Sequence, residues 1–99
     1  MPENPLLPIA TNDPELSKNL ESCRELAFSD GALPKKVKFL IAIALDASKG
    51  SDGGVRSLAQ DALKASATKQ EIMEALRVAH FICGASSTYT AGRGLKDVF

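Results

Sequence analysis

Residues 61–84 read DALKASATKQEIMEALRVAHFICG, and this stretch decides the fold class. Apolar residues recur at spacings of three and four on both sides of a short break, which predicts two helices joined by a tight turn. Ser66 occupies the position at which the left-handed closing residue of the first helix is expected. Thr68 and Glu71 have the spacing of a capping box, in which each side chain accepts a hydrogen bond from the backbone N–H of the other residue. The second helix is therefore predicted to run from Lys69 to about Cys83.

The segment before residue 30 divides into an arm and a helix. Residues 1–12 contain three prolines and few periodic apolar positions, so we expect an N-terminal arm without a helix of its own. Asp13 suits the cap of a helix and Pro14 suits its first position. The apolar residues of this helix form one stripe, which consists of Leu16, Leu20, Cys23 and Ala27.

Two more helices are predicted between the first helix and the 61–84 segment. One opens at Pro34 and runs to about Ser48, and the other runs through Ala65 from a cap at Ser51 or Asp52. The stretch 86–94 is ambiguous. Its small residues allow close helix packing, but each of its two glycines weakens a helix by about 1 kcal/mol.

Length and composition predict one all-α domain of four to five helices, residues 13–99. The chain has 99 residues with twelve acidic and twelve basic side chains, and no segment alternates with period two. No basic stripe with interleaved aromatics is present, so we expect no nucleic-acid partner. The longest apolar run, 39–45, is far too short to span a membrane. The first residues lack the charged and apolar parts of a secretory signal, so we expect a cytoplasmic protein.

The helix at 34–48 predicts self-association. Nearly every position after its lysines is apolar, and a helix that is apolar on all sides must be buried on all sides. A few short helices from one small chain can hardly surround it, so we expect a homo-oligomer with an interface on this helix. The alternative is that this is the central helix of a monomer.

Together with the apolar helix 37–45, the 61–84 segment resembles the carboxymuconolactone decarboxylase family, which includes the alkylhydroperoxidase-D-like proteins. The resemblance covers roughly residue 33 to the C-terminus. It implies a small all-helical fold assembled as a homotrimer or homohexamer. It also implies one of two activities, thiol-dependent peroxide reduction or lactone decarboxylation.

The resemblance matters mainly for the residues that are missing. In the redox branch of the family, a Glu, a C-x-x-C pair and a His form the reaction centre. These four positions fall on Phe39, Ser51, Gly54 and Leu58, respectively. The nucleophilic thiolate, the resolving thiol and the neighbouring base all lack a counterpart there. No cysteine lies within 39–63, so a small shift of the alignment restores nothing.

We therefore expect a family scaffold that has lost the peroxidase residues. The first hypothesis is a non-redox homologue, either a small-molecule binder or a divergent decarboxylase-like enzyme. The acid–base work of a decarboxylase would still need a polar group at the His position, and Leu58 provides none. The alternative hypothesis is a helical protein-interaction module with no catalysis. A polar-lined cleft would favour the first hypothesis, and a large uncovered apolar patch would favour the second.

His80 and Cys83 are the candidate catalytic residues, because they stand one turn apart on one helix face. A neutral imidazole could take the proton of the thiol. The competing interpretation, which we favour, is that both side chains pack. Cys23 and Cys83 lack redox spacing, so we expect two buried, inert thiols.

Ser51 and Arg77 are the candidate ligand-binding residues. A capping role is the favoured interpretation for Ser51, and a solvated position is favoured for Arg77. One His and two Cys per chain cannot complete a four-ligand zinc site without a symmetry partner, and we expect neither a metal nor a cofactor.

Overall fold

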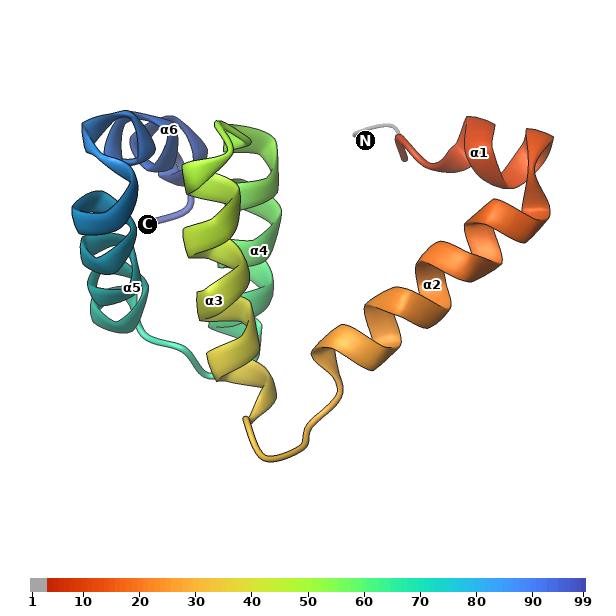
Figure 1. The fold of residues 1–99 in the computed structure, drawn as a ribbon, viewed down its shortest axis with the longest axis horizontal. Coiled ribbons are helices and arrows are strands. Elements are labelled where there is room, and N and C mark those ends of the chain that lie inside the picture. Colours follow the sequence, from red (N-terminus) through yellow and green to blue (C-terminus); the bar gives the residue numbers. More distant parts are fainter. Residues whose placement is uncertain (1–3) are drawn as a thin grey trace.

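The computed structural model describes residues 4–99, and within them six α-helices and no strand are formed (Figure 1). The prediction of an all-α fold is confirmed. The helices are α1 (Leu7–Asn12), α2 (Pro14–Phe28), α3 (Lys35–Ser48), α4 (Asp52–Lys64), α5 (Lys69–Cys83) and α6 (Ala85–Leu95). None of the helices in residues 4–99 has the length and apolar content needed to cross a bilayer.

The capping box at the start of α5 is present as predicted. The Thr68 hydroxyl accepts from the Glu71 N–H at 3.0 Å, and the Glu71 carboxylate accepts from the Thr68 N–H at 2.8 Å. Lys36 of α3 adds an ion pair to the same carboxylate at 3.0 Å. The Thr68 backbone hydrogen bond and then the Lys36 interactions lower the pKa of Glu71. The turn before this helix contains Ser66 with φ of 76°, which confirms the predicted left-handed residue.

Four helices, α3 to α6, build the core. The buried apolar residues come from all four and from the α4–α5 turn: Phe39, Ile43, Ala47, Val55, Ala59, Ala62, Ala67, Ile72, Leu76, Ala79 and Ala91. Six of these eleven residues are alanines, which allow the helix backbones to approach closely. Gly94 takes this further, because a Cβ at that position would lie 2.6 Å from the Asp52 carbonyl oxygen of α4. Such close packing leaves little free space between α4 and α6.

The helices α1 and α2 extend away from this four-helix body (Figure 1). Neither contains a buried residue, and Leu16 and Leu20 of the predicted stripe are 50% and 44% exposed. The end of α2 is fixed by Phe28, whose ring stacks on Phe39 of α3 with centroids 4.8 Å apart. The residues of the predicted stripe lie on α2, but nothing within residues 4–99 covers them.

Two predicted segments differ from the structure. The N-terminal arm contains a helix, α1, whose first turn includes Pro8, a residue with a backbone already suited to that place. Its six residues are too few to give a periodic pattern, and residues 1–3 of the arm lie outside the described part of the chain. The ambiguous stretch 86–94 is helical and belongs to α6.

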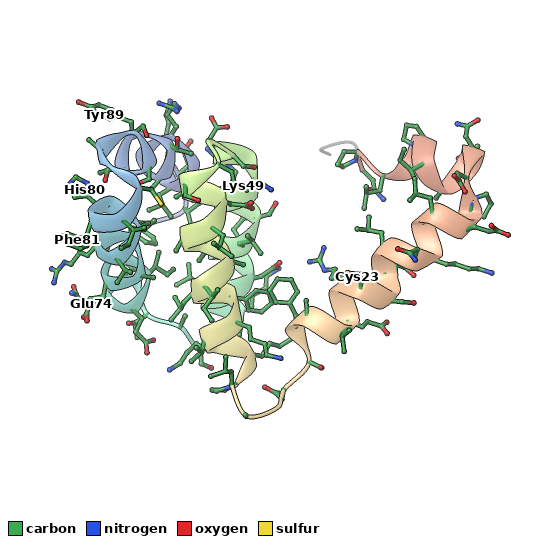
Figure 2. The ribbon with its side chains drawn as sticks, in the orientation of Figure 1. Cys23, Lys49, Glu74, His80, Phe81 and Tyr89 are labelled. Atoms are coloured by element: carbon green, nitrogen blue, oxygen red, sulfur yellow. The ribbon has the colours of Figure 1, made fainter. Side chains whose placement is uncertain are left out.

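The prediction of buried thiols is wrong for the single chain, since Cys23 and Cys83 are both free and exposed. Cys23 lies on the uncovered helix α2 (Figure 2). Cys83 is the last residue of α5, and α2 and α5 lie on opposite sides of α3 and α4 (Figure 1). The two thiols therefore cannot act as a pair within one chain.

The helix α3 is not covered on all sides by its own chain. It packs on α4, α5 and α6, and its buried Phe39 also stacks on Phe28 of α2, whereas Ile41 and Leu45 are 46% and 58% exposed. This uncovered face is the part of the helix for which a subunit interface was predicted.

Candidate functional site

A groove runs between α2 and the body formed by α3 and α4. It consists of two adjoining cavities of about 770 Å³ and 520 Å³, and Arg24, Phe28 and Asp61 line both. We call it the interhelical groove. Both cavities are widely open to solvent, so a small molecule could enter without a change in the backbone.

Two contacts across the groove hold α2 in place. The stacked rings of Phe28 and Phe39 form an apolar contact between α2 and α3. Arg24 of α2 donates to the Asp61 carboxylate of α4 at 3.5 Å. These two side chains are 62% and 32% exposed, so the pair contributes at most about 1 kcal/mol. Its main effect is to keep the Arg24 guanidinium beside a carboxylate.

The groove contains three of the four positions to which the resemblance assigns the redox centre. Phe39 lines the larger cavity, and Gly54 and Leu58 line the smaller one. Ser51 stands at the N-cap position of α4, but its side chain makes no capping hydrogen bond. The favoured capping role of its hydroxyl is therefore wrong. Asp52, whose Oδ1 accepts from the Gly53 N–H at 3.1 Å, makes a local hydrogen bond at this helix start instead.

Asp46, in the last turn of α3, is a groove residue that the sequence interpretation missed. It lines the smaller cavity and its carboxylate lies directly against Gly54 of α4. A Cβ built on Gly54 would overlap that carboxylate and would also lie 2.8 Å from the Ser51 hydroxyl oxygen. The Ser51 N–H donates to the Asp46 carbonyl oxygen at 2.9 Å and so holds the loop in this position. The glycine at position 54, inside a helix, was the one signal in the sequence.

The other candidate residues lie elsewhere. His80 and Phe81 point away from α3 and α4 on the outer side of α5 (Figure 2). The Nδ1 atom of His80 lies 2.7 Å from the Thr88 hydroxyl oxygen of α6. Among residues 4–99, no hydrogen bond joins His80 to Cys83, and both residues are exposed. Arg77 is exposed on α5 and lines neither cavity of the groove.

The structure therefore does not bring the four sequence candidates together. The contact between His80 and Thr88 joins α5 to α6, which fits the packing interpretation of His80. Within residues 4–99, no cluster of three or more His, Cys, Asp or Glu side chains has the arrangement of a metal site.

Comparison with known proteins adds two findings. The model of the carboxymuconolactone decarboxylase family matches residues 14–95. The structure is similar to that of lpg0406 from Legionella pneumophila, a carboxymuconolactone decarboxylase family protein solved in its apo form. The two chains share 35% sequence identity with a TM-score of 0.87, over 92% of this chain and 81% of the other. No curated protein sequence matches the chain.

Proposed function

Because the chain belongs to the carboxymuconolactone decarboxylase family, we propose that it is a non-redox member that binds a small molecule in the interhelical groove. Such a member is either a binder or a divergent decarboxylase-like enzyme. The observation that carries the proposal is the smaller cavity, of about 520 Å³, in which Gly54 and Leu58 stand where the resemblance assigns a Cys and a His. The cavity has the size of a small-ligand site but contains no thiol or imidazole.

The chemistry of the thiols supports the non-redox part of the proposal. Peroxide reduction needs a thiolate and a second thiol close enough to form a disulfide with it. The chain has two cysteines, Cys23 on α2 and Cys83 on α5, and these two helices lie on opposite sides of α3 and α4 (Figure 1). Free thiols also fit the reducing conditions of the cytoplasm, which we propose as the location of the protein.

Self-association into a homotrimer or homohexamer is a second part of the proposal. The uncovered faces of α2 and α3 present Leu16, Leu20, Ile41 and Leu45, each between 44% and 58% exposed. Complete burial of a leucine or isoleucine side chain stabilises an assembly by about 1.5–3 kcal/mol. A second copy that covers these faces would gain several such contributions.

A thiol-dependent peroxidase assay tests the non-redox function. With hydrogen peroxide and dithiothreitol, we expect no turnover above the rate of the variant that carries both Cys23→Ser and Cys83→Ser. Turnover that disappears in this double variant would overturn the non-redox function. Turnover that survives in it would overturn the assignment of the four reaction-centre positions.

The alternative, a protein-interaction module without catalysis, is favoured by the outer face of α5. Val78, Phe81 and Ile82 are 64%, 85% and 71% exposed there. Titration of small probes into the unmodified chain and into Phe81→Asp distinguishes the two functions. If the groove is the functional site, Phe81→Asp leaves the binding of small molecules to the groove unchanged. If no small probe binds the groove in any form of the protein, the interaction module becomes the better proposal.

A further inference from the structure

We propose that Asp46 is the charged anchor of the interhelical groove and that its carboxylate binds the ammonium group of a small organic cation. This inference rests on the proposed function, because it names the class of molecule that the groove would take. It is carried by the position of Asp46, by the close approach of its carboxylate to Gly54, and by the charges around the smaller cavity.

The Asp46 carboxylate has no partner within the described chain. Asp46 is half-buried and lines the smaller cavity, yet none of the hydrogen bonds or ion pairs within residues 4–99 involves its side chain. An ionised carboxylate can only accept hydrogen bonds, so its natural complement is a donor, and the strongest is a cationic one. The smaller cavity is open to solvent, so this carboxylate can accept from a cationic ligand that enters it.

Gly54 is what lets the Asp46 carboxylate lie directly against α4 in the wall of the smaller cavity. Any side chain at position 54 would overlap the Asp46 carboxylate, and the Ser51 hydroxyl oxygen lies 2.8 Å from the same point. The neighbouring Gly53 has no atom within 4 Å of the place of its Cβ. Glycine inside a helix costs about 1 kcal/mol relative to alanine. Of these two neighbouring glycines, only Gly54 stands where a side chain would meet other atoms.

The other charges of the smaller cavity leave Asp46 unmatched. Arg24 is already paired with Asp61. Lys49 also lines the cavity, on the side of the body that faces α2 (Figure 2), but makes no ion pair with Asp46.

Apart from Ser57, the remaining side chains of the cavity wall are apolar and belong to Phe28, Ala42, Leu45 and Leu58. An ammonium group on a small apolar body complements both the carboxylate and these walls. We therefore expect a cation with one donor end and one apolar end.

The test is a titration followed by ¹⁵N NMR, with three probes of one size: benzylammonium, benzyl alcohol and benzoate. In the unmodified chain we expect benzylammonium to bind most tightly and to shift the amide signals of Asp46, Ser51 and Gly54. Asp46→Asn should weaken the affinity for benzylammonium by about tenfold or more and leave the affinity for benzyl alcohol nearly unchanged. Asp52→Asn is the matched control, because it removes the same charge from outside the groove and should change none of the affinities.

A second pair of variants tests the close approach of the Asp46 carboxylate to Gly54. Gly54→Ala should displace the Asp46 carboxylate and weaken benzylammonium binding, whereas Gly53→Ala should not. The amide spectrum of each variant shows whether it is folded. If Asp46→Asn and Gly54→Ala both leave benzylammonium binding unchanged, Asp46 is not the anchor.

The outcomes separate this inference from the proposed function. If benzyl alcohol and benzoate bind the groove as tightly as benzylammonium, the groove is a binding site but the cation preference is wrong. If none of the three probes shifts signals of the groove at millimolar concentration, the inference fails, and the proposed function loses its support as well.

Discussion

Gly94 offers the sharpest test of how α6 packs on α4. A methyl group added there would lie 2.6 Å from the Asp52 carbonyl oxygen and 2.7 Å from the Cβ of Val55. Val55 is fully buried and the carbonyl belongs to the backbone, so neither can turn aside. Overpacking of this kind costs about 1–3 kcal/mol. The gain in helix propensity from Gly to Ala, up to about 1 kcal/mol, offsets part of it.

We therefore expect Gly94→Ala to lower the free energy of unfolding by about 1–2 kcal/mol. The matched control is Gly92→Ala, two residues earlier in the same helix, where no atom lies within 4 Å of the added Cβ. This control should raise the stability by up to about 1 kcal/mol. Urea unfolding followed by circular dichroism, at one protein concentration for all variants, gives both values. If Gly94→Ala proves as stable as Gly92→Ala, the close approach of α6 to α4 is wrong.

Three further predictions concern other parts of the chain. The pKa of Glu71 is lowered in the folded state. The ionised Glu71 carboxylate therefore contributes its full stabilisation above the ordinary carboxyl range, and this stabilisation is lost as the pH falls through the lowered pKa. The stability difference between the unmodified chain and Glu71→Gln should thus shrink between about pH 7 and pH 3, as urea midpoints would show. Light scattering at micromolar concentration should report an oligomer. The double variant Ile41→Asp and Leu45→Asp should shift the equilibrium toward the monomer. An unmodified chain that is monomeric at every micromolar concentration would contradict the proposed assembly. Finally, Cys83 should be alkylated no faster than Cys23. His80→Ala should leave the alkylation rate of Cys83 unchanged, because His80 hydrogen-bonds Thr88 instead. A large drop of this rate in His80→Ala would revive His80 and Cys83 as a catalytic pair.

The parts of the fold that depend on neighbouring residues could be predicted from the sequence. The capping box at Thr68 and the left-handed Ser66 are local signals, and both are present. The start of α2 at Asp13 and Pro14 was likewise predictable, because Asp13 accepts from the Leu16 N–H at 3.0 Å.

The parts that depend on distant residues could not be predicted. The direction of α2 is set by the stacking of Phe28 on Phe39, a contact that no periodicity reveals. The same holds for the site. Asp46 and Gly54 belong to different helices, and only the packing of α3 on α4 places the carboxylate where a side chain at position 54 would be.

The attachment of α2 has a consequence for thermodynamic linkage. One wall of the groove is a helix with no buried residue, held to the body near its end by Phe28 and Arg24. Any event that fixes the tilt of α2, such as a neighbour seated on Leu16 and Leu20, also fixes the width of the groove. The event that fixes α2 then changes the affinity of the groove for a ligand. By linkage, a ligand bound in the groove must favour that event by the same free energy. Occupancy of the groove and assembly of the protein would form one coupled equilibrium, so that an affinity measured at a single protein concentration would describe only one point on it.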